Sequence, residues 1–476
     1  MLGMIVGLVV TYVAAPISLF LGAWRLGDFD EDSAPLVLVC AGGAGPFAIA
    51  LMLWSLFLIA PGFSDRFYFL VIFSIVTVLF LYGVWPYLSH RRDFFPTARG
   101  KKIVSWSKPT DWFIPVLTLI LIAMVVTVVY QTLSTPLFMN DPLEYLQVSK
   151  HIYDLKSMNA YPIDEPLATG LYVNVNHPPG FNMLLVWSII IGGDATSTAL
   201  RGINIFYFLA TIALLWVAMK DRPVLARLFA VLMLLSGPLY LSLVIGMHTD
   251  PQRIFLFYSA FCMLSLALIK PTMHMVVLSG VFVGFSLFSH SIGLLTLPFA
   301  GGIWLLLSRQ SFSSKICSIA VLSFVALCLG GGQYFINLWL VGTPLADYEP
   351  ILDLALFNYQ YSLGVQRGLE TLLEKILFGV LRCFTDFSLY GPAFWLGAGG
   401  ALSVLWTKGN LFDWTTDELD ATHLLVVAGY MALATMTALV GVLLVIKNGR
   451  YILTILPFVA FLGGIFLETA YARLRR

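Results

Sequence analysis

Residues 113–130 read FIPVLTLILIAMVVTVVY and contain no charged side chain. About 20 consecutive apolar residues are enough for one α-helix to cross the hydrocarbon core of a bilayer. Residues 424–446 form a second long block without any charge. Blocks of this kind predict that the chain is an integral membrane protein.

The composition of the whole chain favours the same class. Of its 476 residues, 59% are hydrophobic and 11% are charged, whereas soluble globular proteins carry about 25% charged residues. The formal net charge of +1 gives no reason to expect a nucleic-acid partner, which would need a basic surface. The five cysteines form no Cys-x-x-Cys pair, and we expect no disulfide framework.

Apolar blocks recur along the sequence and predict an all-α polytopic membrane protein with about thirteen transmembrane helices. The predicted spans cover residues 3–23, 34–60, 67–88, 112–132, 200–219, 227–246, 252–269, 275–290, 292–307, 316–340, 392–406, 422–446 and 451–470.

Three segments rich in Lys and Arg predict the orientation in the membrane. They are residues 89–111, residues 220–227 and the C-terminal tail. With thirteen spans all three lie on one side, which the positive-inside rule makes cytoplasmic. The acidic segment 24–33 falls on the same side, where acidic residues carry little weight in the rule. The N-terminus is then expected outside.

Two long segments, residues 133–199 and 341–391, fall on the predicted outer face. Residues 178–192 (PPGFNMLLVWSIIIG) are too short to cross and predict an interfacial or re-entrant helix. Residues 355–385 mix apolar and charged side chains and predict a second interfacial helix. Two such helices on one face indicate a covered cavity at the outer leaflet.

Charged side chains at membrane depth cost about 2.5–3.5 kcal/mol each, so those at span ends are candidates for a functional site. Asp141 and Glu144 follow the fourth predicted span and lie three residues apart. On a short helix both can face one way. A carboxylate at this place could act as a general base toward a hydroxyl group, or Asp141 could merely cap the helix.

Three histidines stand near the same predicted face. His177 precedes two prolines and could bond a phosphate or a hydroxyl, although a His beside prolines is more often structural. His248 and Asp250 lie at the outer end of the sixth predicted span. Asp250 could form a simple salt bridge with Arg253 or place a second carboxylate in the same cavity. His290 interrupts a hairpin between two apolar spans.

Lys447, Arg450 and Tyr451 precede the last span on the predicted outer side. Basic residues there go against the positive-inside bias, and Arg is well suited to phosphate, so they indicate an anionic ligand. The alternative is an anchor to lipid headgroups. No nucleotide-binding or hydrolase motif stands in a credible context, and the scattered histidines predict no metal site.

These elements, in this order, resemble the GT-C glycosyltransferases, and in particular the protein O-mannosyltransferase and aminoarabinose-transferase-like group. The resemblance covers roughly residues 112–470. Family elements are matched, in chain order, by Asp141 with Glu144-Tyr145, by His177-Pro178-Pro179-Gly180, by Ser236-Gly237-Pro238 with Asp250-Pro251, and by Arg450-Tyr451 with Pro457.

The resemblance implies a transferase that takes a sugar from a polyprenyl-phosphate carrier at the outer leaflet and passes it to an acceptor hydroxyl. Asp141 would be the base, Arg450 with Lys447 would hold the donor phosphate, and His177 and Asp250 would line the site. The acceptor would be a glycan, a lipid or a protein. A single displacement would invert the anomeric centre. The lipid-linked sugar would be the donor, and no visible ligand motif in the sequence demands a divalent metal.

The resemblance also implies a division of the chain and a location. Residues 1–111 would be three additional N-terminal helices and a basic cytoplasmic loop, favoured as a packing or partner-binding unit. Residues 112–476 would be the GT-C-like catalytic module, in a bacterial inner membrane with its site on the extracytoplasmic side. The sequence departs from the family pattern in these additional spans, at Pro142, where many members have a second acidic residue, and at His290-Ser291, which replaces a Lys-Gly pair.

Other functions are open to a chain with many spans and buried charges. A transporter or lipid flippase would predict inverted repeats and helices broken at the midplane of the membrane. The sequence has no obvious repeat, and its charges gather at the predicted outer ends. A non-catalytic subunit that retains the fold is the third alternative.

Overall fold

A computed structural model describes residues 2–27, 29, 31–90, 112–137, 140–161, 175–176, 178–193, 197–342, 344, 346–347, 374, 381–408 and 449–474. Within these residues the fold is all-α, apart from one pair of two-residue strands. Eight helical stretches are long and apolar enough to cross a bilayer, and one bent pair of helices passes the same test as a unit. The chain is therefore an all-α integral membrane protein.

The elements of the first half are α1 (Leu2–Val9), the π-helical turn η1 (Val10–Ala14), α2 (Ala15–Leu26), η2 (Glu31–Ser33), α3 (Ala34–Ile59), α4 (Asp65–His90), α5 (Phe113–Ser134), α6 (Asn140–Leu155), η3 (Met158–Ala160), β1 (Val175–Asn176), α7 (Gly180–Gly192) and α8 (Ser197–Ala218). The second half holds α9 (Val224–Leu235), α10 (Pro238–Ile245), α11 (Asp250–Ile269), α12 (Met273–Ser289), η4 (Ser291–Leu295), α13 (Thr296–Leu307), α14 (Phe312–Gly330), α15 (Gly332–Val341), β2 (Ala346–Asp347), α18 (Phe387–Tyr390), α19 (Ala393–Lys408), η5 (Gly449–Ile455) and α21 (Leu456–Leu474).

Twelve of the thirteen predicted spans fall on these helices, and the span at 422–446 lies outside the described residues. The predicted span 227–246 is not straight, because α9 and α10 meet at an angle of 68°. The break follows from Ser236-Gly237-Pro238, since a proline ring has no N–H to donate and clashes with a continuing helix. Pro238 instead opens α10. The predicted spans 275–290 and 292–307 correspond to shorter apolar helices, Met273–Ser289 and Ser291–Leu307.

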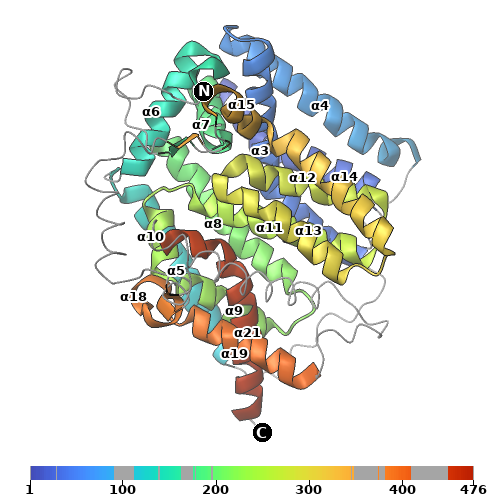
Figure 1. Cartoon of the computed structure of the whole chain (residues 1–476). Coiled ribbons are helices and arrows are strands. Elements are labelled where there is room, and N and C mark those ends of the chain that lie inside the picture. The colour runs from blue at the N-terminus through green and yellow to red at the C-terminus, as the bar shows by residue number, and fades with distance from the viewer. Residues whose placement is uncertain are drawn as a thin grey trace.

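Helix α11 lies at the centre of the bundle and is buried from Asp250 to Leu268 (Figure 1). Helix α3 packs against it, with Phe255 filling the space beside Gly43. The hydroxyl of Tyr207 in α8 donates a hydrogen bond of 2.8 Å to the Gly43 carbonyl oxygen. The N-terminal helices therefore share one core with the rest of the described chain.

The segments predicted to lie on one side of the membrane meet at one end of the bundle. Lys220, just after α8, donates to the backbone oxygen of Asp32 in the turn before α3. At the start of α5, Phe113 stacks on Tyr471 near the end of α21, with ring centroids 5.4 Å apart. Phe229 of α9 lies 6.0 Å from the same Phe113 ring. The N- and C-terminal ends lie far apart in Figure 1.

The two long predicted outer segments also meet, because β1 from the first pairs antiparallel with β2 from the second. The helix expected at 178–192 is α7, which ends at Gly193 in a left-handed turn with φ of 83°. Nine of its thirteen residues are buried, and it packs against α3 and α6 among others. This burial suits a re-entrant segment inside protein better than a helix lying on the surface. Most of the expected helix at 355–385 lies outside the described residues.

Candidate active site

The first turn of α6 presents Asp141. Asn140 opens this helix and Pro142 follows, a position where a missing backbone N–H leaves no helical hydrogen bond unmade. A carboxylate in the first turn also interacts favourably with the helix dipole. The Asp141 side chain keeps 23% of its surface exposed, whereas Glu144, one turn further, is buried.

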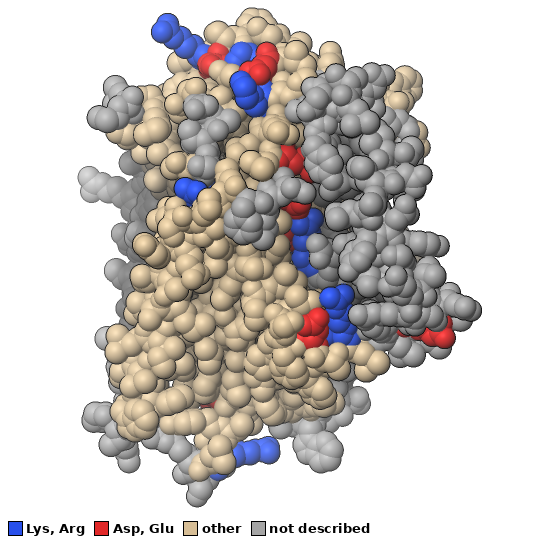
Figure 2. All heavy atoms as spheres, turned by 90° about the vertical axis from the view of Figure 1, so that its left-hand side faces the viewer, with Lys and Arg blue, Asp and Glu red and all other residues tan. Residues whose placement is uncertain are grey.

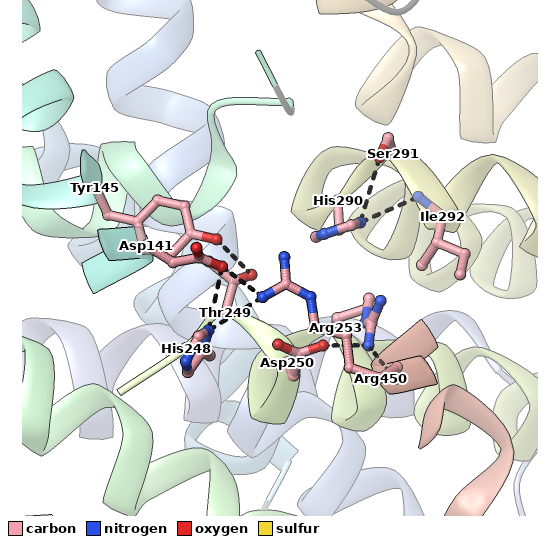
Figure 3. A network of polar contacts seen from close by, with 10 residues as sticks. All are labelled: Asp141, Tyr145, His248, Thr249, Asp250, Arg253, His290, Ser291, Ile292 and Arg450. Atoms are coloured by element: carbon pink, nitrogen blue, oxygen red, sulfur yellow. Dashed lines mark hydrogen bonds and ion pairs between the residues drawn. The ribbon is translucent and has the colours of Figure 1, made fainter. Parts of the chain in front are cut away.

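Arg450, in η5, forms an ion pair with Asp141. Its Nη1 atom donates to Oδ2 of that carboxylate across 309 residues of sequence. The Arg450 side chain is 14% exposed. Figure 3 shows its guanidinium extended toward Asp141 from the opposite side of the site.

His248 is the third member of this cluster, which we call the Asp–His–Arg cluster (Asp141, His248 and Arg450). It lies between α10 and α11, directly after Met247, whose φ is 61°. The His248 Nδ1 atom is 3.2 Å from Asp141 Oδ2 and 3.2 Å from Arg450 Nη1. These two hydrogen bonds exclude one another: a protonated Nδ1 donates to Asp141, and an unprotonated Nδ1 accepts from Arg450. The tautomer of the His248 ring therefore decides which of the two partners its Nδ1 atom bonds.

The surroundings of Asp141 favour its ionised form. Burial alone would raise the pKa of this carboxyl, but the hydrogen bond from His248 and the charges of Arg450 and His248 lower it by more. The pKa of Asp141 consequently lies below its ordinary value. Asp141 is therefore a carboxylate at neutral pH, and a weak base as long as both partners remain in place.

A buried ion pair supports the cluster from behind. Asp250 and Arg253, in the first turn of α11, pair with each other and are 2% and 1% exposed. Arg253 Nη2 also donates to the backbone oxygen of Arg450 at 3.2 Å. Asp250 thus forms the salt bridge that was one of the two alternatives drawn from the sequence, and Arg253 links this pair to Arg450.

Two neighbours complete the described surroundings. The Tyr145 hydroxyl lies 3.4 Å from Thr249 Oγ1, which joins α6 to the break before α11. His290 Nδ1 accepts a hydrogen bond of 3.1 Å from the Ile292 backbone N–H, so a neutral His290 carries its proton on Nε2. In Figure 3 the His290 ring faces the space above the Arg450 guanidinium.

The structure brings together residues from three of the sequence motifs: Asp141, His248 with Asp250, and Arg450. Tyr451 belongs to η5 beside Arg450. His177 and Lys447 lie outside the described residues. Sequence reasoning passed over Arg253 as a site residue, although an Arg three positions after an Asp in an otherwise apolar span was a usable signal.

Charged side chains are unevenly distributed over the surface. Figure 2 shows them gathered in a band on the side of the molecule that lies at the left of Figure 1, beside a broad uncharged surface. Ion pairs at exposed or half-buried positions in the described chain include Lys150–Asp154, Lys156–Asp65 and Arg382–Asp386. Nowhere in the described chain do three His, Cys, Asp or Glu side chains gather as they would around a metal ion.

Comparisons of the chain with models of protein families, with curated proteins and with solved structures gave no match.

Proposed function

We propose that this chain is a membrane-embedded glycosyltransferase of the GT-C type, which moves a sugar from a polyprenyl-phosphate carrier to an acceptor hydroxyl. The observation that carries the proposal is the pairing of Asp141 with Arg450. It places a carboxylate and a guanidinium, the two groups that such a reaction needs, in direct contact. Neither is fully buried, so substrates can reach both.

Arg450 is the donor-phosphate ligand in this proposal. A guanidinium presents several N–H donors in a plane and binds phosphate oxygens in pairs. Negative charge grows on the phosphate as its bond to the anomeric carbon breaks, and a guanidinium already held in place stabilises that charge. The contact from Arg253 to the Arg450 backbone oxygen supplies the necessary fixation.

Asp141 is the base. The acceptor oxygen forms a bond to the anomeric carbon, the bond from that carbon to the phosphate oxygen breaks, and the phosphate keeps the bonding electrons. The acceptor proton passes to Asp141. A weak base is sufficient, because the acceptor hydroxyl becomes strongly acidic as its new bond forms. One displacement inverts the anomeric centre, and the chain's own residues require no covalent intermediate.

The topology in the proposal has thirteen spans, with the end that carries Lys220 and Tyr471 in the cytoplasm. The Asp–His–Arg cluster then faces the extracytoplasmic side of a bacterial inner membrane, where lipid-linked sugars for the cell envelope are used. The antiparallel pairing of β1 with β2 supports this topology, since both strands come from segments predicted to be external.

One observation favours a second candidate, a transporter or lipid flippase. Helices α9 and α10 form a broken span, and His248 lies three residues beyond the end of α10. Broken spans are typical of substrate sites in secondary transporters. A transporter would move its substrate without breaking a covalent bond, and this separates the two functions.

The test supplies purified protein with radiolabelled polyprenyl-phosphate sugars and follows release of polyprenyl phosphate and labelling of acceptors. Asp141→Asn should lower the transfer rate by about 10²–10⁴, the usual contribution of general-base catalysis. Asp154→Asn is the matched control, because Asp154 is an exposed carboxylate on the same helix. Full activity of Asp141→Asn would refute the base. Movement of intact lipid between the leaflets of vesicles, with no cleavage, would instead assign a transporter.

A further inference from the structure

A cavity of about 580 Å³ lies between the N-terminal span, α7 and α8, a size within the range of small-molecule pockets. Its lining residues are three or four positions apart on each helix, as for Met4 and Leu8 of α1 or Gly202 and Phe206 of α8. This spacing places them on one face of each helix. The cavity is therefore an elongated groove between three helix faces.

The walls of the groove are mostly apolar, with hydroxyl groups at Thr11, Tyr12, Ser188 and Thr198. Among the residues that the structure describes, no Lys, Arg, His, Asp or Glu side chain lines it. The Trp187 Nε1–H donates to Thr11 Oγ1 at 2.7 Å, the Thr11 hydroxyl donates to the Gly7 oxygen, and Ser188 donates to the Leu184 oxygen. Because these polar groups bond to the protein itself, the groove suits a hydrocarbon ligand, and burying a polar ligand there would be unfavourable.

Two glycines keep the groove open. At Gly192 and Gly202 an added Cβ atom would meet no heavy atom within 4 Å. Gly202 lies inside α8, where glycine weakens a helix. No neighbouring atom is close enough to explain why a residue without a side chain stands there. The π-helical turn η1 contributes Thr11 and Tyr12 to the opposite wall, and such turns are frequent at functional sites.

The groove lies between helices that meet the criteria for membrane spans, Gly3–Leu26 and Thr198–Ala218. At its edge Met4 and Leu8 are 42% and 43% exposed. Helices that span a bilayer are surrounded by the hydrocarbon chains of its lipids. A phosphate-linked carrier is rare and would need a cationic side chain for its selection, and the described lining residues include none.

We propose that this groove binds one acyl chain of a membrane phospholipid. This acyl chain fills the space between α1, α7 and α8 and holds the N-terminal span against α7. Helix α7 also bears Phe181, whose ring packs edge-on against Tyr145 at 5.3 Å, one turn after Asp141 on α6. The bound acyl chain thus supports α7, which packs against the helix that carries Asp141. Lipid binding in this groove does not depend on which reaction takes place at Asp141.

The test is native mass spectrometry of the full chain in detergent, with palmitoyl-oleoyl phosphatidylglycerol added as the probe. We expect one retained lipid per chain, and Gly202→Leu should weaken its retention by about tenfold or more, since a leucine occupies space that several methylene groups would fill. Gly302→Leu is the matched control: it is also a helical glycine without neighbours at its Cβ, and it lies in α13, away from the groove.

A second measurement does not depend on the fold of a variant. Phosphatidylglycerol with a photoreactive group in its acyl chain should label wild-type peptides that contain residues 184–192 or 198–206. Labelling elsewhere only, or equal lipid retention by wild type and Gly202→Leu, would overturn the proposal. Preferential retention of polyprenyl phosphate, or a dimer that Gly202→Leu dissociates, would overturn it in favour of a lipid carrier or a second copy of the chain.

Discussion

The Nδ1 atom of His248 lies 3.2 Å from the Asp141 carboxylate, and the same atom lies 3.2 Å from the Arg450 guanidinium. Asp141 therefore has two partners, Arg450 and His248, that compete with any substrate for hydrogen bonds to its carboxylate. A donor phosphate that binds Arg450 weakens the contact from Arg450 to Asp141, and the tautomer of His248 decides whether its Nδ1 atom donates to Asp141.

Replacement of Arg450 by Ala should weaken the binding of polyprenyl phosphate. Hydrogen bonds to charged groups contribute about 1.5–3 kcal/mol each, so the dissociation constant should rise by roughly ten- to a hundredfold. Thermal-shift titration with polyprenyl phosphate measures this change. Arg382→Ala, which removes an Arg from the Arg382–Asp386 pair, is the control and should bind normally. Unchanged affinity of Arg450→Ala would mark Arg450 as an anchor to lipid headgroups.

His248→Ala should shift the pH dependence of sugar transfer. The hydrogen bond from His248 is among the causes that lower the pKa of Asp141, so its loss raises that pKa. The base must be ionised to act, and the acid limb of the kcat profile should therefore move to higher pH. His274→Ala, at an exposed position of α12, serves as the control. An acid limb that stays at the same pH would show that His248 does not lower the pKa of Asp141.

Asp141 should also make stability depend on pH in acid. Its pKa in the folded protein is below the ordinary value of 3.8, so its contribution to stability is fully present above pH 3.8 and decreases as the pH falls toward the folded pKa. Asn at this position cannot titrate. The difference in melting temperature between wild type and Asp141→Asn should thus be largest near neutral pH and shrink below pH 3.8. A difference that is constant with pH would contradict the ion pair with Arg450.

Arg253→Met should destabilise the fold strongly, because it leaves the Asp250 carboxylate buried without its ion-pair partner. Removing one member of a buried pair costs about 3–5 kcal/mol, whereas replacing both members is often nearly neutral. Thermal unfolding in detergent should therefore show a large loss for Arg253→Met and a partial recovery for the double variant Asp250→Asn, Arg253→Met. Equal losses for the two variants would show that Arg253 acts mainly through the Arg450 backbone oxygen.

Much of the helical architecture could be predicted from the sequence. In lipid every backbone N–H and C=O must be paired within its own segment, so the length of an apolar block directly indicates a helix. Residues 113–130 fall on α5 and residues 252–269 on α11 for this reason. Asp141 and Arg450 also stood out, because charges near membrane depth are too costly to occur without a role.

The tertiary structure alone decided how these residues combine. Only folding brings Arg450 against a carboxylate 309 residues away, and only the 68° break between α9 and α10 leads the chain to His248 beside both. The groove beside Gly202 likewise exists only between packed helices. Apolar periodicity reports the burial of each helix separately, whereas contacts between side chains depend on where distant helices cross. The sequence by itself therefore determined a membrane-spanning helical chain with candidate charges, and packing decided which of those charges form a site.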